Sequence, residues 1–363
     1  MLLKNIKLQN YRNYDSLFYD FKQRKTLFVG KNAQGKTNLL ESVYYLSALS
    51  SNRIRKDSEL IKFNCEDCRI SADVIKNDID VSLDVYINPP KNKILKVNGL
   101  KKSKSADFLR VLSVVNFSSA DLMLLRGEPT NRRKWLDLAI CQVWGAYYEK
   151  LSKYNKIRLQ KSNFLTQFQI DKTMLDAFNT QFSIAAANIV YLRVKFLVEL
   201  EKIAKEKHKN VSQEEELSFN YESDLDLNLG LKELAQVIYD KLCLLQDEEI
   251  RRQQCLFGPH RDDISFFINK IDAKKYASQG QQRTLVLALK LAELDIIREK
   301  TGEAPILLLD DVLAELDNIR QNYLLASISD DVQTIITSVD TLAFDDEFLS
   351  GVEIVKISAG KII

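Results

Sequence analysis

Residues 30–37, Gly-Lys-Asn-Ala-Gln-Gly-Lys-Thr, form a pattern that can hold phosphate groups. They follow an apolar run that ends at Val29 and precede a run typical of a helix, which starts at Asn38. The two glycines allow backbone N–H groups to point at a phosphate, the Lys36 ammonium can reach the outer phosphates, and the Thr37 hydroxyl can bind Mg²⁺. The start of the helix adds partial positive charge. The sequence therefore predicts a P-loop that binds a nucleoside triphosphate.

The residues of this loop are the first candidate site. We expect the nucleotide to contact Gly30, Lys31, Asn32, Ala33, Gln34, Gly35, Lys36, Thr37 and Asn38. Because Lys36 would lie at the outer phosphates, we also expect it to take part in catalysis. A glycine-containing turn that binds nothing is the alternative, and the strand–loop–helix context argues against it.

Two adjacent carboxylates, Asp310 and Asp311, end a continuously apolar run that starts at Pro305. In a P-loop protein, an acid at the end of a strand helps to bind the Mg²⁺ that the loop hydroxyl and the phosphates share. We therefore predict that Thr37 and Asp310 are the metal ligands. Asp311 is then the predicted catalytic acid that orients or deprotonates the attacking water. An incidental pair of acids is the alternative, and the P-loop disfavours it.

The segment between these two sets of residues determines the predicted domain organisation. Alternating apolar residues predict strands at both ends of the chain: Asn5–Leu8, Tyr14–Phe21, Thr26–Val29, Arg69–Ile75, Asp80–Tyr86 and Leu109–Phe117, then Ile264–Ile268, Pro305–Asp310, Gln333–Thr337, Glu353–Ile357 and Lys361–Ile363. Apolar residues spaced three and four apart predict helices in the middle: Asn131 to about Leu159, Thr173–Lys207 and Leu231 to about Cys255. We therefore predict an α/β fold with a nucleotide-binding lobe, residues 1–120 and 256–363, and an inserted, mainly helical lobe, residues 121–255.

A second phosphate-binding element is predicted in the segment that precedes the strand ending at Asp310. Residues 278–281, Ser-Gln-Gly-Gln, read as a loop before a helix that starts near Gln282. The loop offers a hydroxyl, a glycine for close backbone approach and a positive helix terminus. A helix cap that binds no ligand is the alternative interpretation.

One local basic segment stands out because the formal net charge of the whole chain is only +2. The segment from Lys91 to Lys104 contains six lysines and no acid, and it surrounds an Asn98-Gly99 pair typical of a hairpin turn. A nucleic-acid contact and a solvated hairpin remain equal alternatives here.

Composition excludes several other classes of protein. Hydrophobic residues make up 45% of the chain and charged residues 28%, as in ordinary globular proteins, and the first twenty residues lack a continuous apolar stretch. We therefore expect a cytoplasmic protein that does not enter a membrane. The five cysteines fit reduced thiols; Cys65 and Cys68 have the spacing of a zinc pair, but no second pair follows. Two histidines disfavour histidine-based nucleophilic catalysis.

The chemistry-bearing segments resemble a known family. Residues 278–281 resemble the signature loop of ABC-type ATPases, and residues 314–317, Ala-Glu-Leu-Asp, resemble their D-loop. The closer resemblance, which spans almost the whole chain, is to the RecF family. It is carried, in the order of the family, by Leu8–Tyr14, the P-loop, Arg126–Asp137, Gly258–Asp263, Ser278–Arg283 and Leu308–Asp317.

This resemblance implies a fold and a function. The fold is an ABC-type ATPase head with an inserted lobe, and the function is DNA replication and repair. The family resemblance implies binding of ATP, Mg²⁺, double-stranded DNA and single-strand/double-strand junctions, with RecO and RecR as partners in loading recombinase at gaps. It also implies a homodimer with ATP between the subunits, in which Ser278, Gly280 and Gln281 of one subunit face the P-loop of the other, and a slow ATPase whose turnover releases DNA.

Some features of the chain leave alternatives open. Arg12 resembles an arginine that approaches nucleotide in related heads, although a surface arginine in a strand turn fits as well. Residues 118–121, Ser-Ser-Ala-Asp, replace a Pro-Glu-Asp sequence usual in RecF proteins, and we nominate no site residue there. An ABC transporter ATPase is a second hypothesis, disfavoured by the helical insertion and by the absence of a switch histidine near Thr337. An SMC-type structural head is a third, disfavoured because the helical seam covers under four heptads.

Overall fold

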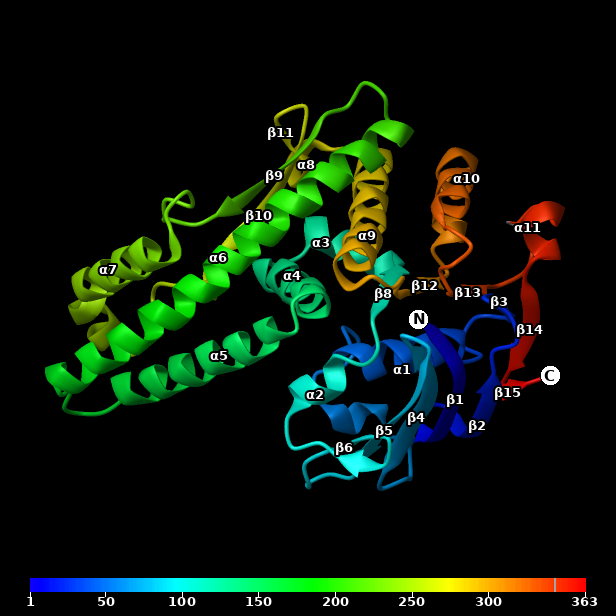
Figure 1. The fold of residues 1–363 in the computed structure, drawn as a ribbon, viewed down its shortest axis with the longest axis horizontal. Coiled ribbons are helices and arrows are strands. Elements are labelled where there is room, and N and C mark those ends of the chain that lie inside the picture. Colours follow the sequence, from blue (N-terminus) through cyan, green and yellow to red (C-terminus); the bar gives the residue numbers. More distant parts are fainter. Residues whose placement is uncertain (343) are drawn as a thin grey trace. The chain divides into compact units, whose positions relative to one another are not determined.

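The computed structural model describes residues 1–342 and 344–363. The chain folds into two units (Figure 1): the first contains Met1–Leu122 and Val286–Ile363, and the second contains Met123–Leu285. The sequence predicted the return to the first lobe at residue 256, whereas residues 256–285 pack with the second unit. The reason is that the strand Asp263–Ile268 pairs with a strand of the inserted segment. None of the described helices is long and apolar enough to cross a membrane.

A six-stranded sheet carries the P-loop in the first unit. Its order is β15-β14-β3-β13-β12-β8. All neighbours are parallel except β14 and β15, which form a terminal antiparallel hairpin. The strands are β3 (Lys25–Val29), β8 (Val114–Ser118), β12 (Ile306–Asp310), β13 (Thr334–Ser338), β14 (Glu353–Ser358) and β15 (Lys361–Ile362). The apolar runs of β12 and β13 are buried along their length, as parallel sheets require.

A second six-stranded sheet of the first unit is antiparallel throughout, with the order β2-β1-β4-β5-β6-β7. Its strands are β1 (Leu2–Tyr11), β2 (Tyr14–Asp20), β4 (Cys68–Lys76), β5 (Ile79–Ile87), β6 (Ile94–Val97) and β7 (Leu100–Lys101). The predicted Asn98-Gly99 turn joins β6 to β7, and both residues have positive φ, 52° and 74°. This is the conformation that a tight hairpin turn requires, and Asn and Gly tolerate it best.

Side chains from both sheets and from α1 (Lys36–Ala48) form one hydrophobic cluster, to which Ile6, Phe28, Val43 and Ile70 belong. The other helical segments of this unit are η1 (Asp57–Leu60), α2 (Ser105–Leu109), η2 (Ser119–Leu122), η3 (Leu313–Glu315), α10 (Asn318–Ser327) and α11 (Asp346–Ser350). The strand predicted from Leu109 begins only at Val114. The helix α2 continues to Leu109 and a turn follows it, in which the N–H of Val111 donates to the carbonyl oxygen of Phe108 at 3.1 Å.

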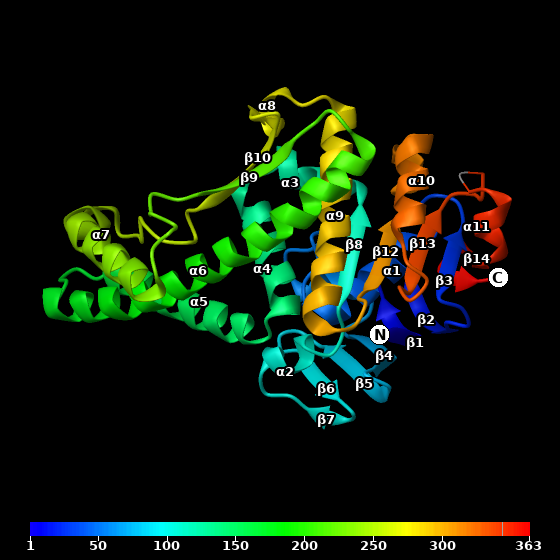
Figure 2. The same ribbon diagram turned by 45° about the horizontal axis from the view of Figure 1, so that its top comes forward.

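The second unit is built from helices and a small sheet (Figure 2). Its helices are α3 (Met123–Arg126), α4 (Pro129–Val143), α5 (Ala146–Leu165), α6 (Lys172–Val211), α7 (Leu231–Arg252) and α8 (Ala273–Tyr276). The helix predicted from Asn131 to Leu159 is thus two helices. Trp144 has extended backbone angles and Gly145, a poor helix former, follows it. The long predicted helix is confirmed as α6, which Asp171 caps.

The small sheet of the second unit was only partly predicted. It has the order β11-β10-β9, with β9 (Leu217–Glu222), β10 (Asp263–Ile268) and β11 (Ile271–Asp272). β9 was not predicted from the sequence, although Leu217, Phe219 and Tyr221 alternate with polar residues. The last helix, α9 (Gln279–Thr301), begins in the second unit and ends in the first.

Candidate nucleotide-binding site

The P-loop lies between the end of β3 and the start of α1, as the sequence predicted. Both of its glycines are required by the surroundings. A Cβ atom on Gly30 would lie 2.3 Å from the carbonyl oxygen of Ile357, and Gly35 has φ of 113°, which side chains rarely allow. The loop therefore keeps a backbone path that other residues could not follow.

Lys36 lies inside this loop. Its side chain is almost fully buried, and Nζ donates hydrogen bonds to the carbonyl oxygens of Gly30 at 2.6 Å and Lys31 at 3.1 Å. In the described part of the chain, the ammonium has no carboxylate partner. A buried cation without a counter-charge is costly, so the loop favours an anion next to Lys36.

The predicted metal ligands lie side by side. Thr37 Oγ1, in the first turn of α1, donates a hydrogen bond at 2.9 Å to Asp310 Oδ1, at the end of β12. Thr337 Oγ1, at the end of β13, donates to the same oxygen at 2.9 Å. Burial raises the pKa of Asp310 above its ordinary value of 3.8, and the two hydroxyl bonds oppose this effect in part. A cation beside Asp310 would stabilise its ionised form.

Asp311 follows directly in an unusual backbone conformation. Its φ is 52°, in the left-handed region, and its N–H donates to Thr337 Oγ1 at 2.9 Å. Thr337 thus contacts both acids. Thr337 was not predicted as a site residue; the signal that could have indicated it is a hydroxyl at the end of β13, a strand parallel to β12.

The loop is also held from the end of the chain and from the β1–β2 turn. The backbone N–H of Ala359 donates to Gln34 Oε1 at 2.6 Å, and the N–H of Gly360 donates to the Gln34 carbonyl at 3.0 Å. Asn13 Nδ2 donates to the same carbonyl at 3.2 Å, and its Oδ1 accepts from Asn38 Nδ2 at 2.8 Å. These contacts, which the sequence analysis missed, orient the loop from two sides.

Arg12 is occupied by an acid on the P-loop helix. Its Nε and terminal nitrogen donate to the two carboxylate oxygens of Glu41 at 2.9 and 2.7 Å. Arg53 contacts the same carboxylate at 3.1 Å, and Ser51 Oγ donates to it at 2.6 Å. Burial lowers the pKa of Arg12, but the bonds to Glu41 outweigh this and raise it overall. The guanidinium is therefore fixed beside α1, next to the P-loop, and its contact with nucleotide stays a prediction.

The predicted signature residues belong to the second unit, whereas the P-loop and the acid pair belong to the first. The segment is helical from Gln279 and not a loop, because Ser278 caps α9. The N–H of Gln281 donates to Ser278 Oγ at 3.2 Å, and the N–H of Ser278 donates to Gln281 Oε1 at 2.8 Å. The exposed Ser278 and the half-buried Gly280 therefore stand at the N-terminus of a long helix, where a cap and a phosphate contact are both possible.

Two further family motifs meet inside the second unit. Arg132 of α4 forms two hydrogen bonds of 2.7 Å with the carboxylate of Asp263. Arg193 of α6 forms two bonds of 2.9 Å with Asp137 and donates to the carbonyl of Pro259 at 2.6 Å. Such buried pairs fix the relative placement of their elements within the unit and are costly to break.

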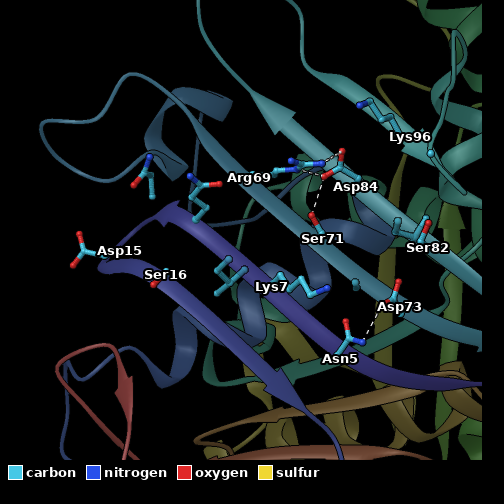
Figure 3. Close-up of a pocket in the computed structure, with 16 residues that line it drawn as sticks. Asn5, Lys7, Asp15, Ser16, Arg69, Ser71, Asp73, Ser82, Asp84 and Lys96 are labelled. Carbon is cyan, nitrogen blue, oxygen red and sulfur yellow. Dashed lines mark hydrogen bonds and ion pairs between the residues drawn. The ribbon is translucent and has the colours of Figure 1, made fainter.

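Two other features carry no metal or ligand assignment. Cys68 is buried, which raises the pKa of its thiol to about 12, so the zinc-binding thiolate is disfavoured. Within residues 1–342 and 344–363, no cluster of three or more His, Cys, Asp or Glu side chains could hold a metal. In a polar hollow on the antiparallel sheet, shown in Figure 3, Arg69 forms an ion pair with Asp84 at 2.5 Å and Asn5 donates a hydrogen bond to Asp73 at 2.9 Å.

Comparison with known proteins gives the class of this fold first. The family model described as "RecF/RecN/SMC N terminal domain" matches residues 2–359. A solved SMC head bound to the C-winged helix domain of ScpA aligns with a TM-score of 0.55, over 100% of this chain and 97% of that chain. Its identity is 14%, so this likeness shows the fold alone. The molecule has the fold of an ABC-type ATPase head.

Sequence relatives specify the family within this class. The DNA replication and repair protein RecF of Staphylococcus carnosus (strain TM300) is 41% identical over 371 residues, and RecF of Bacillus velezensis is 40% identical over 370 residues, each with 100% of both chains covered. The chain belongs to the RecF family of DNA replication and repair proteins. A solved structure of "the recombination mediator protein RecF-ATP in RecFOR pathway" aligns with a TM-score of 0.92 at 31% identity, over 99% of this chain and 96% of that chain.

Proposed function

We propose that this chain is an ATP-dependent DNA-binding protein that acts in the cytoplasm in recombinational repair. The observation that carries the proposal is the 2.9 Å contact between Thr37 Oγ1 and Asp310 Oδ1. It brings the loop hydroxyl and the strand-end acid to one point, which is the arrangement that P-loop proteins use at the phosphates. Two solved structures of related proteins, RecF-ATP and RecF-ATPrS, support the choice of nucleotide.

Each residue of the loop has a defined part in this proposal. Lys36, buried and bonded only to carbonyl oxygens, places its charge where the outer phosphates of ATP would lie. The backbone N–H groups from Gly30 to Thr37 surround the phosphate oxygens. Arg12 and Asn38 lie beside the loop and complete the first half of the nucleotide site.

The same residues fit Mg²⁺. Thr37 Oγ1 and Asp310 Oδ1 are hard oxygen ligands of the kind Mg²⁺ prefers, and the buried carboxylate needs a positive partner. When bound, the ion neutralises phosphate charge that would repel an attacking water. Asp311 accepts a proton from that water or orients it, while Thr337 holds both acids in place.

The second half of the nucleotide site is proposed to come from another copy of the chain. The N-terminus of α9, with Ser278, Gly280 and Gln281, suits the γ-phosphate side of an ATP bound to the partner's P-loop. ATP then links the two subunits, and its slow hydrolysis to ADP and phosphate separates them and releases DNA.

DNA binding is supported by the β6–β7 hairpin of the first unit. Lys96 and Lys101 are directly opposite in the register of the two strands. Like charges at such positions destabilise a hairpin, so an anion that lies between them relieves a cost. Lys91 and Lys104 are exposed, whereas Lys93 is engaged with Asp57 at 3.0 Å and is not available.

We further propose that the duplex and single-strand/double-strand junctions are the DNA partners, and that RecO and RecR cooperate in loading recombinase at gaps. The support is membership of the RecF family and the description of its structural relative as a recombination mediator in the RecFOR pathway.

The test is binding of duplex, gapped and single-stranded DNA with ATP, with ADP and without nucleotide. We expect tight binding to duplex and gapped DNA only with ATP. Lys36→Ala should lose both ATP binding and the ATP-dependent part of DNA binding. Equal DNA affinity in all three nucleotide states, or ATP affinity unchanged in Lys36→Ala, would refute the proposal.

A further inference from the structure

Helices α5 and α6 of the second unit form an antiparallel pair whose composition is unusual. They lie side by side along α5 in Figures 1 and 2. From Lys150 to Ile170 the chain has five Lys or Arg residues and no Asp or Glu, and from Ala177 to Val198 it again has no acid. The whole chain carries 50 acids in 363 residues, so two such stretches on neighbouring helices make a surface of one sign.

The lysines of α5 separate into two groups. Lys161 is fully buried and its Nζ lies 2.6 Å from Glu249, so its charge is neutralised in the core. Lys153 and Lys156 are exposed and, among the described residues, form no ion pair or hydrogen bond. Lys150 is exposed and donates to Asn188 Oδ1 of α6 at 2.6 Å. The free charges therefore lie on the outer side of α5.

The contact of Lys150 with Asn188 shows that the two helices share one face. Residues three and four apart lie on the same side of a helix. Lys153 therefore follows Lys150 on α5, and Ile184 and Tyr191 flank Asn188 on α6. Ile184 and Tyr191 are 54% and 43% exposed, so this face is open. We name these five residues, together with Lys156, the α5–α6 face.

Two acids at the N-terminus of α6 have other partners. Asp176 of α6 accepts a hydrogen bond from Tyr239 of α7, and Asp171 caps α6 through the N–H of Thr173 at 2.8 Å. Glu149 is exposed and marks the start of the acid-free stretch. Other surface lysines of α6 have acidic partners: Lys172 with Asp247 at 3.6 Å and Lys205 with Glu201 at 3.0 Å.

We infer that the α5–α6 face binds the sugar-phosphate backbone of duplex DNA, a surface assignment that rests on the proposed function. Lysines contact phosphates, and amide and hydroxyl side chains such as Asn188 and Tyr191 are the other usual backbone donors. From Lys150 to Lys156 the helix advances about 9 Å, at about 1.5 Å per residue. Duplex DNA carries about one charge per 1.7 Å, so several phosphates lie within that span.

The experiment compares two double variants of the full chain with equal change in charge. Lys153→Gln/Lys156→Gln removes two free cations of the face, and Lys172→Gln/Lys205→Gln, the matched control, removes two cations already paired with acids. Affinity for duplex DNA with ATP is measured between 50 and 200 mM salt, and thermal unfolding verifies that each variant is folded. The salt slope is the slope of the logarithm of DNA affinity against the logarithm of salt concentration. Loss of two phosphate contacts should reduce its magnitude by about 1.8. The affinity gap to wild type should then shrink about twelvefold between the two salt concentrations.

The outcomes separate this surface from the function on which it rests. A reduced slope in the face variant with a wild-type slope in the control supports the assignment. A wild-type slope in the face variant overturns it while leaving DNA binding by the chain intact. If wild-type protein binds no DNA in any nucleotide state, the proposed function and this surface are both refuted.

Discussion

Gln34 Oε1 accepts a hydrogen bond of 2.6 Å from the backbone N–H of Ala359, which joins the P-loop to the last turn of the chain. The neighbouring N–H of Gly360 donates to the Gln34 carbonyl at 3.0 Å. The P-loop pattern leaves the identity of position 34 open. In this chain, the open position supplies the side chain through which the C-terminal hairpin holds the phosphate-binding loop.

The first prediction concerns this contact. Gln34→Ala should weaken ATP binding about fivefold, since a typical hydrogen bond contributes about 1 kcal/mol and the loop loses one of its supports. Deleting residues 359–363 removes the donors from the other side and should weaken binding at least as much. Titration with a fluorescent ATP analogue measures both.

The combined variant tests whether the two changes act through one contact. If they do, adding Gln34→Ala to the deletion should cost little more than the deletion alone. Removal of the exposed Ile363 alone is the control and should leave affinity near that of wild type, because the turn at 359–360 remains. Fully additive losses would show that Gln34 does not act through Ala359.

The second prediction follows from the burial of Asp310. Burial raises the pKa of this carboxyl, so its ionised form is disfavoured in the nucleotide-free protein. Asp310→Asn removes the charge and retains an oxygen that can accept from Thr37 and Thr337. The variant should gain about 1 kcal/mol of stability, or about 1–2 °C in Tm, while losing Mg²⁺-dependent ATP hydrolysis.

Calorimetry of wild type and Asp310→Asn, with and without MgATP, measures the Tm values that test this prediction. Wild type should gain more in Tm from MgATP than Asp310→Asn does, since at equal concentration a ligand that binds more tightly stabilises the fold more. The sign of the pH effect is defined. The pKa of Asp310 is higher in the folded chain than in the unfolded chain. Its contribution to the free energy of unfolding is therefore fully present below pH 3.8, the ordinary pKa, and is lost as the pH rises through the folded-state pKa. An unchanged Tm together with retained hydrolysis would contradict the assignment.

Much of the fold could be predicted from local patterns. The apolar run before Asp310 and the strand–loop–helix context of the P-loop depend on residues adjacent in sequence, so β12 and β3 were predicted within one residue and the start of α1 within two. The Asn98-Gly99 turn was likewise confirmed, because only a few residue types tolerate its backbone angles.

Features that depend on distant partners could not be predicted in the same way. Nothing near Gln34 indicates that Ala359 will meet it. Strand β9 follows a long helix and pairs with β10. Because of this pairing, residues 256–285 belong to the second unit, and the boundary lies after Leu285 and not at residue 256. The contact of Thr337 with Asp310 depends on the alignment of two parallel strands, which the sequence does not state.

A third prediction concerns the N-terminus of α9. Ser278→Arg should leave ATP binding by the monomer intact but prevent ATP-dependent dimerisation, because a bulky cation would replace the hydroxyl that we propose to face the partner's nucleotide. Sedimentation with and without ATP measures the dimer. Ser278→Thr preserves the cap and the hydroxyl and is the control that should still dimerise. If Ser278→Arg forms the ATP-dependent dimer as readily as wild type, Ser278 does not lie at the dimer interface.

A fourth prediction concerns the β6–β7 hairpin. Neutralising its lysines at 101, 102 and 104 should weaken duplex binding and reduce the salt slope by up to about 2.7 if each contacts a phosphate. The hairpin itself should become more stable, because Lys101 no longer opposes Lys96. The control neutralises three cations of the same unit that have aspartate partners: Lys4, Lys25 and Lys62. Equal salt slopes in the hairpin variant and the control would show that the hairpin lysines are solvated and do not contact DNA.

A fifth prediction concerns pH and the His260 side chain in the second unit. Burial lowers the pKa of His260 from 6.5 to about 4; the nearby arginines at 158, 261 and 133 act in the same direction, and a hydrogen bond with the Cys255 carbonyl opposes them. His260 Nδ1 lies 2.6 Å from the hydroxyl of Tyr154, whose pKa burial raises, so the neutral phenol donates to the neutral ring.

The consequence is a defined loss of stability in acid. Below pH 6.5 the unfolded chain binds a proton at this position, whereas the folded chain does not until about pH 4. Stability should therefore fall across this window as pH decreases, by at most about 1.4 kcal/mol per pH unit and by less for a ring that is partly exposed. His260→Asn retains an acceptor for Tyr154 but does not titrate, so its free energy of unfolding should depend less on pH. Urea unfolding of both proteins at pH 7, 5.5 and 4.5 measures the difference, in which all other titrating groups cancel. Parallel pH profiles would show that the ring is protonated as easily in the folded chain as in the unfolded one.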